Sequence, residues 1–153
     1  MIILSKLADY GVIIATRLAA SPAQMTAAQL AADTILPQTT VAKVLKLLAK
    51  GGIVTATRGA AGGYHLAREA EEISISDIVA SIDGAFALTE CTSHAGPCVR
   101  NQFCPTRPHW AKINDAVDLA LRQVTLAEMR TPAPSSAMAL FAQYPQTSQQ
   151  AVS

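Results

Sequence analysis

All three cysteines of this 153-residue chain lie in one segment, CTSHAGPCVRNQFCPTRPHW, which begins at Cys91. Six residues separate Cys91 from Cys98 and five separate Cys98 from Cys104, which is wider than the CxxC pairs usual in zinc ribbons and fingers. An odd number of cysteines also argues against a disulfide framework. Thiolates are the normal ligands of iron–sulfur clusters, and a loop with Gly and Pro lets three of them converge. The spacing alone leaves three chemistries open: an iron–sulfur cluster, a zinc ion, or redox-sensing thiols.

Composition and hydropathy favour a single soluble domain. Half of the residues are hydrophobic and only 15% are charged, which suggests a surface buried against a partner. No apolar run approaches the roughly 20 residues that a membrane-spanning helix needs. Asp9 and Arg17 interrupt an N-terminal stretch that otherwise imitates a signal peptide. We therefore expect a cytoplasmic protein without a membrane partner, in which clustered thiols stay reduced and bind metal more often than each other.

Charge is distributed unevenly along the chain. Residues 1–68 carry seven Lys or Arg against two Asp, a balance of +5, whereas residues 69–153 carry five basic against nine acidic residues, a balance of −4. A basic N-terminal half suggests a polyanion as partner, and an acidic second half suggests a separate role. Many solvated faces are also locally basic. The motifs must therefore decide whether the basic half binds a polyanion or is only solvated.

Residues 26–50 predict two short helices across a tight turn. Thr26 and Gln29 form a capping box at the start of the first helix, and Pro37 suits the start of the second. This arrangement is compatible with a helix-turn-helix, whose second helix enters the major groove by its N-terminal end. Gln can pair with adenine, Thr can contact phosphate or a thymine methyl, and Lys suits phosphate. The alternative is an ordinary helical hairpin. The predicted DNA-contacting side chains here are Gln38, Thr39, Thr40, Lys43 and Lys46.

The next stretch, IVTATRGAAGGYHLA, predicts a strand, a glycine-rich turn and a second strand. Gly59, Gly62 and Gly63 permit positive φ or a close approach of the backbone to another surface, which we expect to be DNA. Arg58 at the tip suits insertion into a narrow minor groove, although a solvated turn cation is the alternative. A helix-turn-helix followed by a β-wing is a winged helix. The predicted fold class is therefore mainly α with a small β-wing.

Two more helical segments follow. ISISDIVASIDG predicts a short helix with Ser76 as N-cap and Gly84 as its end. From Pro108 the spacing of apolar residues by three and four predicts a longer helix with a seam for another helix. We expect this seam to form a homodimer, because dimeric DNA-binding proteins need two recognition helices; packing within one chain is the alternative. The seam consists of Trp110, Ile113, Val117, Ala120 and Val124.

These elements predict four regions along the chain. Residues 1–84 form a winged helix-turn-helix domain, residues 85–107 a cysteine loop, residues 108–129 a dimerisation helix, and residues 130–153 a flexible tail. No nucleophile–base pair is recognisable, and the glycine-rich wing lacks the Lys-Ser/Thr ending of a phosphate-binding loop. We therefore expect no enzymatic activity.

As a set, the residues resemble the IscR/NsrR-type family of winged-helix transcription regulators. LSKLADYG, TRGAAGGYHL, ISISDIVASIDG, the three-cysteine loop and CPTRPHWAKINDAVDLALRQVTLAEM fall in the family's order over residues 1–129. The resemblance is greatest to the subgroup that regulates the SUF iron–sulfur assembly operon. It implies a homodimeric repressor that binds a promoter palindrome in double-stranded DNA, with an iron–sulfur cluster on each subunit tuning DNA affinity. The implied cluster is [2Fe-2S] in preference to [4Fe-4S], bound by Cys91, Cys98 and Cys104.

The resemblance leaves the fourth cluster ligand open. IscR-like members use a His three residues past the last Cys, and that position is Arg107 here, which cannot ligate. His109 lies two residues further, and NsrR-like members instead use an Asp that corresponds to Asp9, supplied by the opposite subunit. His94 or a small molecule are the remaining alternatives. The rival function is a winged-helix regulator without a cluster, stabilised by zinc or sensing thiol redox state.

Overall fold

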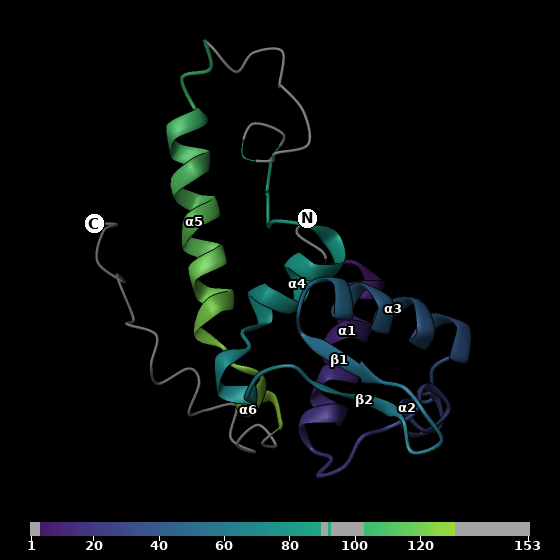
Figure 1. The fold of residues 1–153 in the computed structure, drawn as a ribbon. Coiled ribbons are helices and arrows are strands. Elements are labelled where there is room, and N and C mark those ends of the chain that lie inside the picture. The colour runs from purple at the N-terminus through teal and green to yellow at the C-terminus, as the bar shows by residue number, and fades with distance from the viewer. Residues whose placement is uncertain (1–3, 90–91, 93–102, 131–153) are drawn as a thin grey trace, which may run out of the picture.

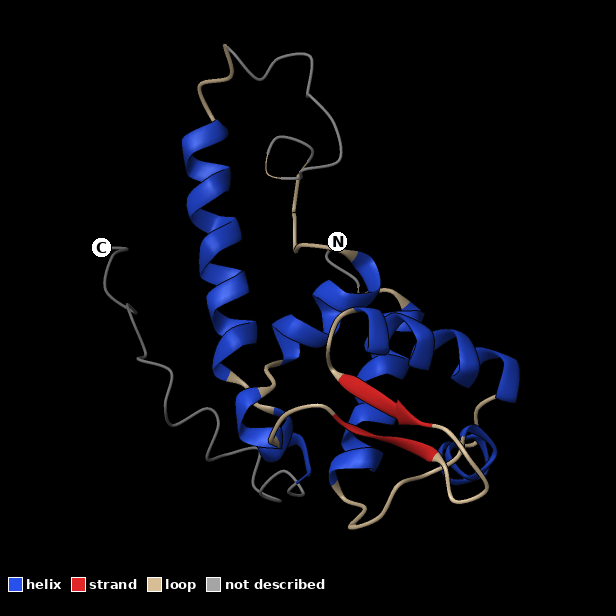
Figure 2. Ribbon diagram, viewed as in Figure 1, coloured by secondary structure: helices blue, strands red, loops and turns tan. Residues whose placement is uncertain are grey.

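The computed structural model describes residues 4–89, 92 and 103–130 of the chain. The elements are α1 (Lys6–Ala19), α2 (Ala27–Thr34), α3 (Gln38–Lys50), β1 (Val54–Thr57), β2 (Gly63–Leu66), a 3₁₀ turn η1 (Ala70–Glu72), α4 (Ile75–Asp83), α5 (Arg107–Gln123) and α6 (Leu126–Arg130). Helices therefore dominate, and the two strands form a small antiparallel sheet, as Figures 1 and 2 show. This confirms the predicted fold class. Most of the predicted cysteine loop and tail lies outside the described residues.

Helix α1 forms the centre of the core. Ser5 caps it by accepting a hydrogen bond from the Ala8 N–H at 3.0 Å. Helices α3, α4 and α6 all pack against it. At Gly11 a Cβ atom would overlap the Ile82 side chain, so glycine at this position allows α4 to approach α1 closely. Its buried residues are Ala8, Gly11, Ile14, Ala15 and Leu18.

The helix-turn-helix forms as predicted. Thr26 and Gln29 exchange the two hydrogen bonds of a capping box at the start of α2. Pro37 is the N-cap of α3 and therefore lies one residue before the helix. The inner face of α3 packs into the core, and its buried residues are Val41, Val44, Leu45 and Leu48.

The wing is attached to the helix-turn-helix through its second strand. Strands β1 and β2 pair from Val54 with Leu66 to Thr57 with Gly63. On its other edge, Tyr64 exchanges backbone hydrogen bonds with Met25, of 2.8 and 3.0 Å, just before α2. The sheet therefore fixes the wing relative to the helices that precede it.

The start of α4 differs from the prediction. Ser74, and not Ser76, is the N-cap, and it forms a capping box with Asp77. Ser76 lies inside the first turn, is buried, and donates a hydrogen bond to Asp118 on α5. The Ser-x-x-Asp spacing satisfies two backbone donors at once, which explains why the chain starts the helix two residues earlier.

The predicted dimerisation helix, residues 108–129, consists of two helices with different surroundings. Helix α5 stands beside the rest of the molecule, its N-terminal end projects past it (Figure 1), and none of its residues is buried. After Val124 the chain turns, and Leu126 in α6 is fully buried in the core. A capping box of Thr125 and Glu128 starts α6. Among the described helices, none combines the length and the apolarity required to cross a lipid bilayer.

Candidate DNA-binding surface and cysteine site

The N-terminal end of α3 presents polar and basic side chains to solvent. Gln38 and Thr39 are exposed in its first turn and Thr40 is half-buried. Lys43 and Lys46 are exposed further along the same helix, which contains no acidic residue. Neither lysine forms an ion pair with another described residue. These cations are therefore available for a polyanion.

The wing turn adds one more exposed cation. Arg58 follows β1 directly, is exposed, and forms no ion pair within the described ranges. Gly59 has φ of +117°, a conformation that favours glycine. A Cβ at Gly62 would overlap the carbonyl groups of the turn, and one at Gly63 would approach the Met25 carbonyl to 2.9 Å. These glycines thus shape the wing, and their contact with DNA stays a prediction.

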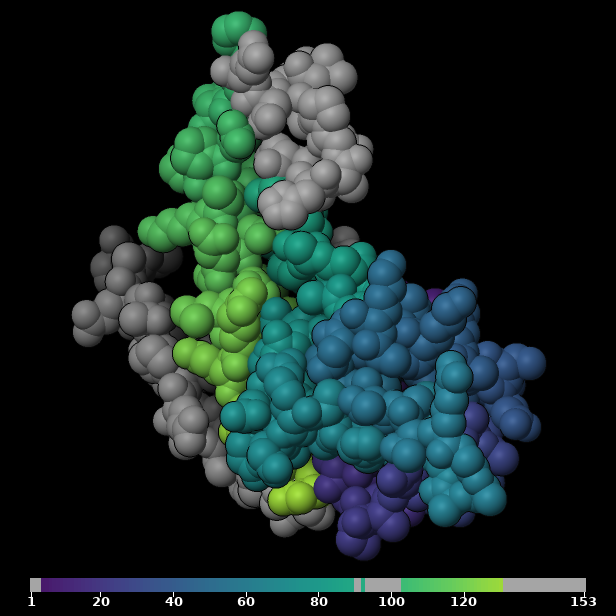
Figure 3. Space-filling view, in the orientation of Figure 1, coloured from purple at the N-terminus to yellow at the C-terminus, as the bar shows by residue number. Residues whose placement is uncertain are grey.

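Helix α3 and the wing share one side of the molecule. Figure 3 shows α3 in blue beside the wing in teal, on the side away from α5. The fold therefore brings together predicted residues that lie up to twenty positions apart in the chain. We call this set the α3–wing surface: Gln38, Thr39, Thr40, Lys43, Lys46 and Arg58.

Cys104 is the only predicted thiol ligand within the described residues, because Cys91 and Cys98, like His94, lie outside them. Cys104 is half-buried, and its Sγ atom lies 3.2 Å from the Thr106 hydroxyl. It lies two residues before Thr106, the N-cap of α5, and the first turn of this helix contains no acidic residue. Because unpaired N–H groups give a helix N-terminus a partial positive charge, this position favours an anionic sulfur. The described part of the segment thus fits a thiolate ligand.

Asn114 on α5 attaches the other end of the cysteine segment. Its Oδ1 accepts a hydrogen bond from the Leu88 N–H at 3.0 Å, and its Nδ2 donates to the Phe86 carbonyl at 3.3 Å. A turn follows, in which the Thr92 N–H donates to the Thr89 carbonyl at 3.0 Å. The chain on both sides of the segment is therefore tied to α5. Sequence analysis missed Asn114, since an Asn within a helix gives no local signal of this contact.

The two candidates for the fourth ligand occupy different elements. Asp9 is exposed in the first turn of α1, and its carboxylate makes no hydrogen bond or ion pair with another described residue. His109 is exposed in the first turn of α5, near Cys104 in the chain. Within the described ranges, no three His, Cys, Asp or Glu side chains converge as a metal site would require. With two of the three thiols outside those ranges, the predicted ligand set stays a prediction.

One hydrogen bond connects α4 to α5, and a second one within α5 shares its acceptor. The Ser76 hydroxyl and the Arg122 guanidinium both donate to the Asp118 carboxylate. These bonds, the one from Ser76 first, hold the pKa of Asp118 below its ordinary value. Asp118 is thus ionised at neutral pH and ties the helix of the cysteine site to the winged helix.

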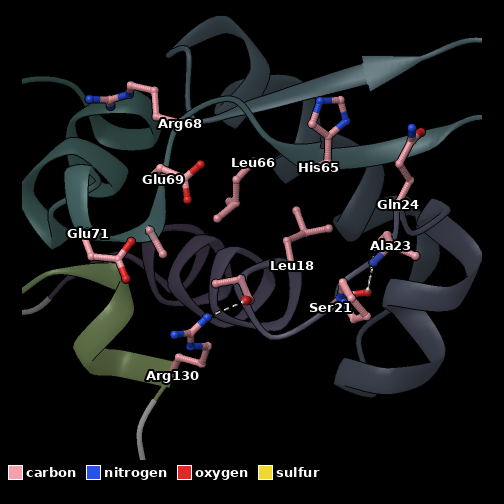
Figure 4. Close-up of a pocket in the computed structure, with 13 residues that line it drawn as sticks. Leu18, Ser21, Ala23, Gln24, His65, Leu66, Arg68, Glu69, Glu71 and Arg130 are labelled. Carbon is pink, nitrogen blue, oxygen red and sulfur yellow. Dashed lines mark hydrogen bonds between the residues drawn. The ribbon is translucent and has the colours of Figure 1, made fainter.

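A cavity of about 540 Å³ lies apart from both of these regions, between the end of α1, strand β2, η1 and α6 (Figure 4). Its walls carry charges of both signs, from Arg68, Arg130, Glu69 and Glu71, and all four side chains are exposed. Arg130 donates to the Ala19 carbonyl at 3.3 Å. None of the lining residues belongs to α3 or to the cysteine segment, so the cavity is not part of either predicted site.

Relatives and solved structures share this architecture. The chain is 37% identical over 87 residues to the protein rrf2 of Nitratidesulfovibrio vulgaris, covering 57% of this chain and 58% of that protein. It is 32% identical over 82 residues to the HTH-type transcriptional regulator IscR of Serratia proteamaculans, covering 54% of this chain and 49% of IscR. It thus spans about half the length of these curated relatives.

A similar solved structure is CymR, described as the global cysteine regulator of B. subtilis. It superposes with a TM-score of 0.68 at 26% identity, over 88% of this chain and all of CymR. Residues 4–132 match the Rrf2 family, described as an iron-dependent transcriptional regulator. These relatives are regulators and not enzymes, and they confirm the predicted resemblance to IscR-type proteins. With a family match over most of its length, the chain belongs to the Rrf2 family of transcriptional regulators.

Proposed function

We propose that this protein is a cytoplasmic, homodimeric repressor that binds promoter DNA and whose DNA affinity depends on an iron–sulfur cluster. The observation that carries the proposal is the pair of links made by α5. Asn114 ties α5 to the backbone of residues 86 and 88, just before the cysteine segment, and Asp118 ties α5 to α4 of the winged helix. Cys104, at the other end of the segment, lies three residues before the start of α5. A change at the cysteines therefore has a direct physical route to the DNA-binding half.

The α3–wing surface supports the DNA-binding part of the proposal. The N-terminal end of α3 enters the major groove, where Gln38 and Thr39 contact base edges and Thr40 contacts phosphate or a thymine methyl. Lys43 and Lys46 bind phosphates, and each such contact makes affinity more dependent on salt. Arg58 enters the neighbouring minor groove, where a narrow A·T-rich groove concentrates negative potential.

The cluster, [2Fe-2S] in preference to [4Fe-4S], is bound by Cys91, Cys98 and Cys104. The electropositive helix end beside Cys104 supports an anionic group there. When bound, the cluster supplies a cross-link that forms and breaks with iron supply and oxidant. Ordering one residue costs about 1–2 kcal/mol of conformational entropy. A cross-link across the cysteine segment lowers this cost, and its loss therefore favours release of the segment from α5. The genes of SUF-type cluster assembly are the proposed targets.

The fourth ligand is either the partner subunit's Asp9 or His109 of the same chain. Asp9 is the favoured choice, because its carboxylate is exposed and has no partner among the described residues of its own chain. A ligand from α1 would also connect the cluster to the core helix of the DNA-binding half. Comparing Asp9→Ala with His109→Ala by Mössbauer and visible absorption spectroscopy assigns the ligand, since only the true ligand's loss changes the iron environment.

A second candidate function is that of a winged-helix regulator without a cluster, either stabilised by zinc or sensing thiol redox state. The likeness to CymR, described as a cysteine regulator, favours it. In this alternative the cysteines form a reversible disulfide or bind one zinc ion together with His109.

Anaerobic purification separates these functions. The proposal expects a brown protein with iron and sulfide in equal amounts, and altered affinity for a duplex that the protein itself selects from a random library when Cys91, Cys98 and Cys104 are all replaced by Ser. A colourless protein with one zinc per subunit indicates the zinc site. An iron-free protein whose DNA binding responds to oxidant indicates the thiol sensor. Unchanged binding by the triple variant contradicts every cysteine-dependent function.

A further inference from the structure

The turn between α2 and α3 contains an unusual residue. Ile35 ends α2 in the left-handed region, with φ of 57° and ψ of 34°, and it is the only non-glycine residue with positive φ in the described part of the chain. A β-branched side chain is poorly suited to this conformation, which glycine adopts without strain. The side chain of Ile35 is also 90% exposed.

Packing within the chain does not explain Ile35. Leu30 before it is fully buried and Leu36 after it packs against the core, so these two residues anchor the turn. The backbone is satisfied as well, because the N–H groups of Ile35 and Leu36 both donate to the Ala31 carbonyl. The turn could therefore form equally well with glycine at this position. The isoleucine is both strained and exposed to water, and neither state is favourable for an isolated chain.

The position of Ile35 indicates what its side chain contacts. Ile35 lies three residues before Gln38, at the end of α3 that enters the major groove in the proposed function. We propose that Ile35 is a further specificity-determining residue, whose apolar side chain packs on a thymine methyl group in the operator. In the major groove that methyl group is the apolar feature that distinguishes thymine from the other bases. The inference rests on the proposed DNA binding.

The test combines protein variants with a modified operator. Ile35→Gly removes the side chain and the strain, so its thermal unfolding midpoint is expected to rise by a few degrees. Its affinity for the selected operator is expected to fall about five- to tenfold, while affinity for random duplex stays unchanged. Replacing operator thymines by uracil, which deletes only the methyl groups, is expected to weaken binding of the wild type at one position in each half-site by a similar factor. The same replacement is expected to have no effect on Ile35→Gly.

Two matched variants sharpen the result. Ile35→Val keeps a β-branched apolar side chain and is expected to keep both the affinity and the sensitivity to uracil. Ile35→Asn tolerates positive φ but is polar, and it is expected to behave like Ile35→Gly. Selective binding by the wild type that is unchanged in Ile35→Gly overturns this inference and leaves the proposed function standing. A wild type that binds no duplex selectively overturns both, and loss of stability in Ile35→Gly assigns the residue a structural role instead.

Discussion

In the winged-helix body, formed by α1 to α4, the wing and α6, large apolar side chains such as Ile14, Leu45 and Ile78 are fully buried, whereas α5 has no buried residue. Helix α5 contacts the body through the partly buried Leu121 and through the bond between Asp118 and Ser76, and Asn114 binds the backbone of residues 86 and 88, which follow α4. Polar links contribute about 1 kcal/mol each, and buried apolar side chains contribute more. Buried apolar packing therefore holds the body together, whereas α5, which has no buried residue, is expected to move at a lower cost in free energy.

The largest expected loss of stability tests whether α6 belongs to the packed body or, like α5, to its edge. Leu126→Ala removes a fully buried side chain of α6 from the core of the body and is expected to lower the free energy of unfolding by about 2–5 kcal/mol. Leu119→Ala, on α5 and 56% exposed, is the matched control and is expected to change it by less than about 1 kcal/mol. Urea unfolding at low protein concentration measures both. Equal losses would abolish the distinction between the regions.

The next effect concerns the exposed apolar face of α5. Trp110 and Ile113 are 40% and 45% exposed in the single chain. In the proposed dimer, Ile113→Asp buries a charge at the interface and is expected to weaken dimerisation by at least about 2 kcal/mol, or some thirtyfold. Sedimentation or light scattering measures the dimer fraction, and Lys112→Asp on the neighbouring exposed surface is the control. A variant that remains as dimeric as the wild type would place the interface elsewhere.

Asn114 tests the link between α5 and the cysteine segment. Asn114→Ala removes both of its hydrogen bonds to the backbone, and we expect about 1–3 kcal/mol less stabilisation of that segment. Faster loss of visible absorption under iron chelation is the expected readout. Asn114→Asp keeps the acceptor for the Leu88 N–H and loses only the donor. Its rate of absorption loss should therefore lie between those of the wild type and Asn114→Ala. If the wild type and both variants lose visible absorption at the same rate, Asn114 does not stabilise the cysteine segment.

The link from α5 to α4 has a predicted pH dependence. Hydrogen bonds from Ser76 and Arg122 lower the pKa of Asp118 from its ordinary value of 3.8. A carboxyl with a lowered folded-state pKa stabilises the fold fully above its ordinary value, and this contribution is lost as pH falls through the lowered pKa. At pH 7, Asp118→Asn is expected to cost about 1 kcal/mol, a modest figure because Arg122 is largely exposed.

The difference between Asp118→Asn and the wild type should shrink as the pH falls below 3.8. Asp115→Asn, on the same helix and exposed, is expected to match the wild type throughout. Denaturant titrations at several pH values measure the effect. If the difference in unfolding free energy does not depend on pH, the charge of Asp118 does not contribute to the contact.

The smallest expected effect lies on the α3–wing surface. Lys43→Ala is expected to leave stability unchanged and to lower the slope of log affinity against log salt by about one unit, the value for one lost phosphate contact. Arg58→Ala should also relax the A·T preference at the edges of the operator half-sites. Binding titrations over a range of salt concentrations measure both. Slopes equal to that of the wild type would mean that these cations are only solvated.

Local patterns predicted much of the body. The capping box of Thr26 and Gln29 depends on two residues three positions apart, so spacing alone suffices to find it. Ser76 was misassigned because Ser74 and Ser76 both suit an N-cap, and only the packing of α5 uses the second hydroxyl. Asn114 and Ile35 gave no local signal, because the first acts on distant backbone and the second stands out only by its φ angle and exposure.

By itself the sequence determined the order of the elements, the cysteine segment and the basic N-terminal half, because composition, spacing and capping residues are local properties of a chain. Only the tertiary structure decided that Leu126 returns to the core while α5 stays at its edge, and that α3 and the wing share one side. Those facts depend on which apolar surfaces meet, a matter of three-dimensional packing between residues far apart in the chain.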